Sequence, residues 1–221
     1  MKYNLIRSNR KTLAIYIKNG EVQVRAPLKM TDDVIEKFVL SKENWIVTKV
    51  SQSNERKLQR ESFALNYGSL ILYRGKEYPI VLSEKNRAGF DGERFFMPPG
   101  LTPEQIKTAC IKLYLILAKQ HLTERTHLLS KQMLSAPNTI KINGAKTRWG
   151  SCSSKKNINY SWRIIMADDE IIDYIIVHEL AHLTEMNHSK KFWAVVASVL
   201  PNYRELNKKL KNFNAISLLY L

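Results

Sequence analysis

The chain has 221 residues, of which 44% are hydrophobic and 25% charged, a composition typical of a globular protein with one large domain or two small ones. Its formal net charge of +15 predicts an anionic partner such as nucleic acid, a nucleotide or an acidic protein surface, although a basic surface without a specific partner is the alternative. No stretch approaches the roughly 18 to 20 apolar residues that span a bilayer, and residues 1–20 lack the continuous apolar core of a signal peptide, which argues against a membrane partner.

The first predicted elements are the two strands of a hairpin. Apolar residues alternate with other residues over 13–17 and again over 22–26. Asn19-Gly20 lies between the two runs, and Asn-Gly is among the strongest signals for a tight hairpin turn. We therefore expect two antiparallel strands near the start of the chain.

A helix and several short strands are expected next. Thr31, followed by two aspartates, is typical of a helix N-cap, and apolar residues at helical spacing continue over 34–46. Residues 51–61 are polar and fit either a fraying helix or a loop. Three short β segments then follow, separated by glycines, at 69–73, 77–82 and 94–97.

The best candidate for a domain boundary is the Pro-Pro-Gly sequence at 98–100, because proline and glycine interrupt both helices and strands. It divides the chain into a β-rich N-terminal part with a helix, residues 1–100, and a C-terminal part, residues 101–221. The second part begins with a long helical pattern that Pro103 opens and Pro137 ends.

Two further strands and two further helices are predicted beyond that helix. The strands cover 139–143 and 157–165, are joined by a Gly- and Ser-rich turn at 150–154, and would form a short antiparallel sheet. Acidic residues at 168–170 mark the start of one helix, and a last helix runs over 188–200. The fold class expected is therefore α+β.

Charge is distributed unevenly over this second part. Residues 125–167 contain eight Lys or Arg and no acid, whereas 168–185 contain six acids and no base. The basic segment suits phosphates or carboxylates bound beside a neighbouring site. The two segments could equally pack side by side for structural reasons alone.

The most informative motif is HExxH at 178–182. Two histidines four apart lie on one face of a helix and can reach one metal ion, which favours zinc with His178 and His182 as ligands. Glu179 is then placed to act as the general base on water that the metal activates. The alternative needs no metal: two buried histidines satisfied by the backbone, and a solvated glutamate.

The third ligand predicted is His188, because a ligand from beyond the helix completes a tetrahedral site better than one from the same face. Glu185 is its rival, either as a ligand or as a group that supports the ligands. His121 and His127 lie six apart in the long helix and on different faces, so they are assigned surface or structural roles.

Other residues with useful chemistry lie near the motif or share its helix. Arg148, Tyr160 and Tyr174 are candidates to stabilise an oxyanion, although Tyr174 also suits core packing. Cys110 and Cys152 have no CxxC spacing, so neither a disulfide framework nor a cysteine-based zinc site is expected. A reducing, cytoplasmic location is the simplest expectation.

Further motifs surround the HExxH. The sequence KTRWGSC occupies 146–152, Asp-Tyr stands at 173–174 and Phe-Trp follows at 192–193. Together with residues 10–27, this combination resembles the YgjP-like family of zincin metallopeptidases, which is related to the WLM and SprT-like groups. The resemblance covers nearly the whole chain and implies one continuous family unit over about 10–215, within which the Pro-Pro-Gly sequence would be an internal junction.

The resemblance implies a zincin-like helical part with zinc at His178, His182 and His188 and with Glu179 as the catalytic base. An edge strand beside such a site commonly pairs with an extended peptide through its backbone. The residues implied to bind substrate or stabilise the transition state lie on the strands beside the cleft: Arg148, Trp149, Gly150 and Ser151.

The function expected first is a zinc-dependent metallopeptidase, because the zincin helix most often hydrolyses peptide bonds. One alternative is a metal-dependent nucleoside triphosphate pyrophosphohydrolase, in which the same site acts on a phosphoanhydride and residues 125–167 hold the phosphates. Another is a nucleic-acid-associated protease or binding protein of the SprT-like kind. That alternative requires the Lys and Arg residues to cluster on one face.

Overall fold

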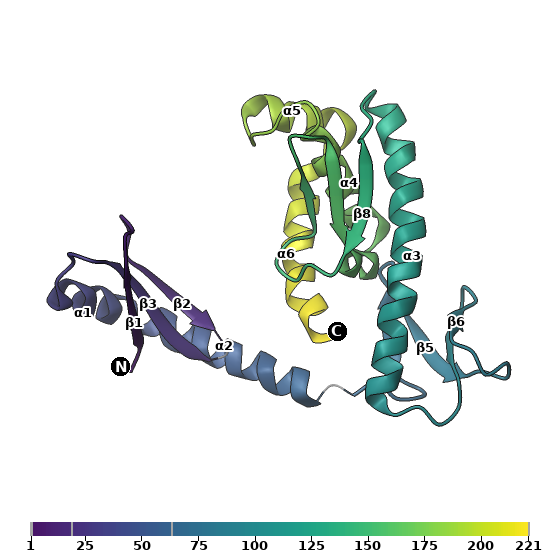
Figure 1. Cartoon of the computed structure of the whole chain (residues 1–221), viewed down its shortest axis with the longest axis horizontal. Helices are drawn as coiled ribbons and strands as arrows, with labels where there is room; N and C mark the ends of the chain where they lie inside the picture. Colours follow the sequence, from purple (N-terminus) through teal and green to yellow (C-terminus); the bar gives the residue numbers. More distant parts are fainter. Residues whose placement is uncertain (1, 19, 63, 221) are drawn as a thin grey trace. The chain divides into compact units, whose positions relative to one another are not determined.

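The computed structural model describes residues 2–18, 20–62 and 64–220, which fall into two compact units, 1–63 and 64–221. Six helices, a short 3-10 helix and three small sheets make up these residues (Figure 1), which confirms the predicted α+β class. None of the described helices has the length and apolar character that crossing a membrane requires. Within the helices, the side chains of residues 56, 59–62 and 214–220 are not described.

The first unit is built on a three-stranded sheet with the order β1-β3-β2. Strands β2 (Ala14–Lys18) and β3 (Glu21–Pro27) pair antiparallel, so the predicted hairpin is confirmed. Of its predicted turn, Asn19 lies outside the described residues and Gly20 has a φ of +82°. Strand β1 (Asn4–Ser8) pairs parallel with β3 and was not predicted, because no local turn joins the two strands.

Two helices pack against this sheet and complete its core. Helices α1 (Asp32–Ser41) and α2 (Glu43–Ser62) replace the single helical pattern expected over 34–46, and the break lies at Lys42. Helix α2 continues through the polar residues 51–61, which settles their assignment as helix. The core residues come from alternate positions of β3 and from both helices: Val22, Val24, Ala26, Ile35, Val39 and Ile46.

The second unit begins with a small sheet of order β4-β5-β7-β6, which confirms the three predicted β segments and adds a two-residue strand. Gly75 occupies the turn after the first strand with a φ of +74°, and a Cβ there would lie 2.8 Å from the Cβ of Asp168. Glycine is therefore needed where this turn approaches a later part of the chain. The strands are β4 (Leu70–Tyr73), β5 (Lys76–Leu82), β6 (Gly89–Phe90) and β7 (Phe95–Met97).

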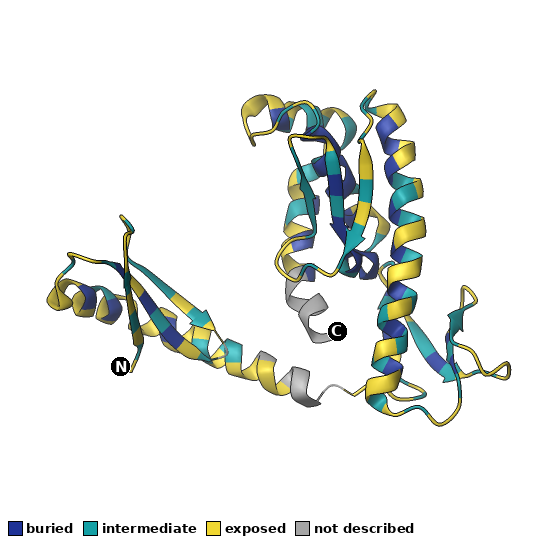
Figure 2. Cartoon of the chain, in the orientation of Figure 1, coloured by how far each residue is buried: buried dark blue, intermediate teal, exposed yellow. Residues whose placement is uncertain are grey.

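Helix α3 (Pro103–Gln132) links the small sheet to the rest of the second unit, and it confirms the long helix predicted there. Thr102 and Gln105 form a capping box at its start, which satisfies two orphan backbone N–H groups. The Tyr114 hydroxyl donates to the Leu72 carbonyl at 2.5 Å and so joins the helix to β4. A buried stripe recurs at every fourth position (Figure 2): Ile106, Cys110, Tyr114, Ala118, Leu122, Thr126 and Ser130.

The Pro-Pro-Gly sequence at 98–100 lies between β7 and α3, inside the second compact unit. The chain therefore does not divide into two compact units at this sequence. The division lies between residues 1–63 and 64–221. The division into parts 1–100 and 101–221 stays a prediction about domain organisation.

The sheet beside the HExxH helix is mixed, not purely antiparallel as expected. Its order is β8-β10-β9, with β8 (Thr139–Asn143) parallel to β10 (Asn157–Ser161) and β9 (Gly150–Cys152) antiparallel to it. Residues 150–152, expected in a turn, thus form an edge strand. The turn follows at 153–156, where the Ser153 and Lys156 amides donate to Asn157 and Ser153 carbonyls.

The strand expected over 157–165 ends at Ser161 because residues 162–166 form the 3-10 helix η1. Its four apolar residues are buried, and a short apolar segment does not by itself distinguish a strand from a helical turn. Helices α4 (Asp169–Ala181) and α5 (Lys190–Val199) confirm the two predicted helices. Helix α6 (Tyr203–Tyr220) was not predicted and packs against α4.

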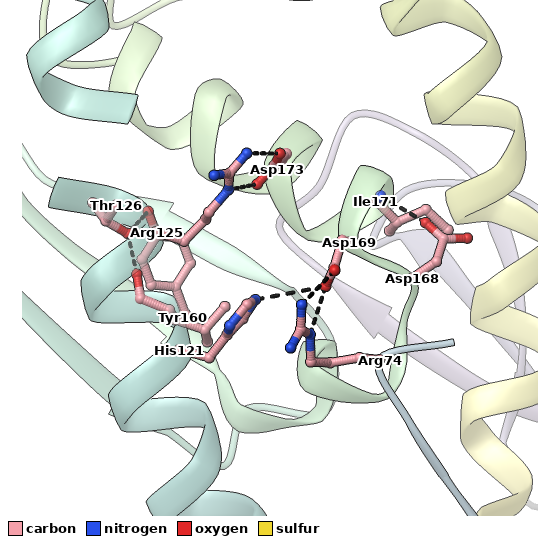
Figure 3. Close-up of polar contacts among 10 residues, drawn as sticks. Arg74, His121, Arg125, Thr126, Tyr160, Asp168, Asp169, Ile171 and Asp173 are labelled. Atoms are coloured by element: carbon pink, nitrogen blue, oxygen red, sulfur yellow. Dashed lines mark hydrogen bonds and ion pairs between the residues drawn. The ribbon is translucent and has the colours of Figure 1, made fainter. Parts of the chain in front are cut away.

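Ion pairs hold α4 in place from two directions (Figure 3). Arg125 of α3 donates two hydrogen bonds to the Asp173 carboxylate, both at 2.6 Å. Arg74, in the turn after β4, donates through Nε to Asp169 in the first turn of α4 at 2.7 Å. His121 Nε2 lies 3.6 Å from the same Asp169, but burial lowers the pKa of this imidazole, and the two groups form an ion pair only when it is protonated.

Candidate metal centre

Three imidazoles converge where α4 ends. His178 lies in the last turn of α4 and His182 is its C-cap residue, so their spacing of four places them on one face. The chain then turns tightly, with the Glu185 amide donating to the Ala181 carbonyl at 3.0 Å, and returns to bring His188 alongside. Ligand nitrogens of the three histidines all lie within 4.8 Å of one another.

The separation of these nitrogens fits a tetrahedral zinc ion. Nitrogens bound to zinc at about 2.0–2.1 Å lie roughly 3.3 Å from one another in a tetrahedron. His178 Nε2 and His188 Nε2 are 3.0 Å apart, and the full set stays within 4.8 Å. Burial, with the neighbouring His182 and His188, lowers the pKa of His178 to about 4, and burial lowers the pKa of His182. Both imidazoles are therefore neutral at pH 7, as metal ligands must be.

The orientation of His182 is fixed by the turn that follows it. Its Nδ1 lies 3.1 Å from the Glu185 carbonyl oxygen, a distance at which an Nδ1–H donates and leaves Nε2 free for a metal. The Glu185 carboxylate does not belong to the cluster that the three histidines form. Glu185 thus contacts the site through its backbone, which favours His188 over Glu185 as the third ligand.

Two aromatic side chains of α5 form a wall behind the histidines. Phe192 is fully buried, and its ring centroid lies 4.6 to 4.9 Å from the centroids of His178, His182 and His188. Trp193 packs against His178 and His188 at 5.9 and 5.8 Å. In the sequence, Phe192 and Trp193 stand out only as part of the family pattern. A phenylalanine four residues after the candidate ligand His188 is the sequence signal that points to such a wall.

Glu179 is buried beside the histidines, with only 5% of its surface exposed. Among the described atoms its Oε2 has no hydrogen-bond partner. Burial raises the pKa of the Glu179 carboxyl to about 7, against an opposing effect of Arg148. An unpaired buried carboxyl is costly, and groups of this kind concentrate at functional sites.

Strand β9 lies directly against the Glu179 carboxyl. A Cβ built on Gly150 would lie 2.5 Å from Glu179 Oε1 and 2.6 Å from its Cγ, so no side chain fits there without a shift. Gly150 therefore lets the edge strand approach the carboxyl closely. This contact joins residues far apart in sequence, and periodicity could not reveal it.

The other predicted site residues have varied surroundings. Arg148 is exposed, and its charge acts on Glu179. Trp149 packs on Phe213 of α6 at a centroid distance of 5.3 Å, and Ser151 pairs with Asn159 within the sheet. Arg148 and Trp149 precede β9 and Ser151 lies within it, and their role in binding substrate stays a prediction.

The two tyrosines considered for oxyanion stabilisation are both buried. Tyr160 is completely inaccessible, and its hydroxyl lies 3.3 Å from that of Thr126. Tyr174 is 3% exposed, with its ring set edge-on to His178 at 6.1 Å. Packing therefore accounts for both side chains. His127, also assigned a surface role, is exposed on α3.

Comparison with known proteins identifies a family model and several solved structures. The model described as YgjP-like, metallopeptidase domain, matches residues 11–213. The metallopeptidase zymogen of Pyrococcus abyssi abylysin has 22% identity and a TM-score of 0.39, covering 41% of this chain and 92% of its own. The metallopeptidase zymogen of Methanocaldococcus jannaschii jannalysin has 23% identity and a TM-score of 0.37. The match covers 41% of this chain and 94% of the jannalysin chain. A comparison with curated proteins finds no match.

Proposed function

Because the chain belongs to the YgjP-like family of metallopeptidases, we propose that it hydrolyses peptide bonds with a zinc ion held by His178, His182 and His188 and with Glu179 as the general base. The observation that carries the proposal is the meeting of three imidazole nitrogens, within 4.8 Å of one another, beside a buried carboxyl without a partner among the described atoms. A set of three nitrogen ligands favours zinc over calcium or magnesium, which prefer oxygen.

The ion, when bound, supplies Lewis acidity to the carbonyl and to water. Glu179 moves the proton: its carboxylate accepts one from the attacking water and returns it to the amide nitrogen that leaves. Burial behind β9 keeps this carboxyl out of bulk water, and the contact with Gly150 limits its freedom to rotate. These features support Glu179 as the group that holds the proton.

Substrate alignment is assigned to β9. This strand is the outer member of its sheet, so one side of Gly150–Cys152 has backbone groups that no neighbouring strand of the sheet pairs. An extended peptide added there would run past Glu179, because Gly150 lies against that carboxyl. We assign Arg148 and Trp149, in the segment that leads into β9, and Ser151 of β9 to the same substrate-binding surface.

The two alternatives rest on the basic segment 125–167, and part of that charge is already engaged. Arg125 pairs with Asp173, and Arg163 donates to the Gly144 carbonyl at 2.9 Å while stacking on Trp162. The phosphate and nucleic-acid alternatives therefore have fewer uncommitted cations than the sequence indicates. We retain the peptidase proposal and place it in the cytoplasm, since Cys110 and Cys152 are both free thiols.

The direct test is digestion of a mixture of unstructured peptides by the purified full chain. We expect new peptide termini, loss of cleavage after treatment with a chelator, and recovery when zinc is added back in stoichiometric amount. Mass spectrometry of the termini is the measurement. Release of pyrophosphate from nucleoside triphosphates, with the peptides left intact, would refute the peptidase proposal and favour the first alternative.

Replacing Gly150 with alanine is expected to lower peptide hydrolysis by about a hundredfold while zinc is retained. The new Cβ would fall 2.5 Å from Glu179 Oε1, and a displacement of about 1 Å at a reacting group can cost that factor. Gly144→Ala is the matched control in the segment before β9, since its Cβ would meet Trp162 Nε1 and Arg163 Nη1 only at ordinary contact distances of 3.6 and 3.9 Å. Equal rates of peptide hydrolysis in the two variants would show that the close contact between Gly150 and Glu179 does not position the carboxyl.

A further inference from the structure

The exposed charges that flank the three histidines are nearly all positive. Lys146 and Arg148 lie in the segment that leads into β9, and Lys190 and Lys191 are the first residues of α5. All four are exposed. Across residues 144–153 and 183–193, which hold these cations, Glu185 is the sole acidic residue.

The segment carrying Arg148 is held in place by the neighbouring strand. The Ser161 hydroxyl donates to the Ala145 carbonyl at 2.7 Å, and the Ser161 amide donates to the Trp149 carbonyl at 2.8 Å. Arg148 lies between these two anchors and two residues before Gly150, which faces the Glu179 carboxyl. Its guanidinium has no hydrogen-bond or ion-pair partner in the described part of the chain, so it presents an unsatisfied cation close to the proposed base.

The second pair of cations is placed by α5. Ser189 caps this helix by accepting from the Phe192 amide at 3.3 Å, and Phe192 packs against all three histidines. Lys190 and Lys191 therefore follow His188 directly along a segment that the site itself anchors. The partial positive charge of the helix start adds to theirs.

We propose that this rim selects peptides that carry a carboxylate close to the bond to be cleaved, and that Arg148 is the main specificity-determining residue. The proposal rests on the peptidase function proposed above. Arginine presents a planar fork of donors that matches a carboxylate, and its charge is permanent. The carboxylate can come from an acidic side chain or from the C-terminus of the peptide, and these two sources are chemically distinguishable.

The experiment uses four matched peptides and the full chain. One peptide carries Glu near the cleavage site, one carries Gln there and one carries Lys, each with an amidated C-terminus; the fourth is the Gln peptide with a free C-terminal carboxylate. We expect wild type to favour a carboxylate-bearing peptide by about tenfold in kcat/KM, mostly through KM, and the preference to shrink in high salt. Preference for the Glu peptide indicates a side-chain carboxylate, and preference for the free C-terminus indicates the terminal one.

For each variant, the quantity compared is kcat/KM for the carboxylate-bearing peptide divided by kcat/KM for the neutral peptide. The absolute rate is not used. Arg148→Gln is expected to reduce this ratio about tenfold, and Arg148→Glu to reverse the preference towards the Lys peptide. Lys112→Gln, an exposed site on α3 with the same change of charge, should leave the ratio at the wild-type value. Circular dichroism confirms that each variant is folded.

The outcomes separate this inference from the proposed function. If wild type cleaves none of the peptides, the peptidase proposal fails and the inference with it. If cleavage depends on Glu179 while the ratio is near one, or is unaltered in both Arg148 variants, the inference alone is overturned.

Discussion

Glu179→Gln is expected to bind zinc as wild type does and to lose peptide hydrolysis by about 10²–10⁴-fold. Glutamine keeps the size of the side chain but cannot accept the proton of the attacking water. Only 5% of Glu179 is exposed and its Oε2 has no partner among the described atoms, so no described hydrogen bond at that oxygen is broken by the exchange. The effect should therefore fall on kcat while the fold is preserved.

Two measurements on the same preparation make this prediction decisive. Zinc per chain is determined by elemental analysis, and cleavage of a reporter peptide by chromatography. Glu170→Gln is the matched control, since Glu170 is an exposed acid on the same helix that pairs with Lys209. A Glu179→Gln enzyme with a wild-type rate would remove Glu179 from the chemistry and leave the metal site without its proposed base.

Removal of any one histidine is expected to weaken zinc binding by more than about a hundredfold, the upper range for loss of a group that merely orients a ligand. Three nitrogens within 4.8 Å make each imidazole a direct ligand in the proposed site, so His178→Ala, His182→Ala and His188→Ala should behave alike. Activity should fall with zinc content in all three.

Competition against a chromophoric chelator measures the affinity. His127→Ala serves as the control because His127 is exposed on α3, and it should bind zinc normally. Glu185→Gln tests the rival ligand, since the exchange removes the carboxylate and keeps the backbone carbonyl that accepts from His182. Normal zinc affinity in His188→Ala, together with weak zinc binding in Glu185→Gln, would show that Glu185 is the third ligand.

Features encoded by short-range patterns could be predicted from the sequence. The spacing of His178 and His182 places both on one helix face whatever surrounds them, and Pro103 marks the start of the long helix because proline suits the first helical position. The hairpin of β2 and β3 follows from alternation around a turn signal. In each case neighbours in sequence decide the structure.

Features that depend on distant partners could not be predicted. Strand β1 is recognisable only through β3, and β9 is a strand only because β10 pairs with residues 150–152. The approach of Gly150 to Glu179 and the contact of Phe192 with three imidazoles are likewise tertiary. Helix α6 was not predicted, although Asn202 and Glu205 at its start are typical of a helix N-terminus, and it is placed by its packing on α4.

The turn between β4 and β5 has a consequence for how the protein is made. Its Arg74 and Gly75 amides donate to the Ile165 and Met166 carbonyls, and the Arg74 side chain holds Asp169, which lies 95 residues later. At a synthesis rate of about 5–20 residues per second, this turn waits roughly 5–20 s for its partners. The residues proposed to hold zinc emerge later still, together with Glu185 and Phe192, which contact them. A nascent chain therefore gains this binding geometry only once residues up to Phe192 have been synthesised, and zinc capture becomes a marker that these segments have folded together.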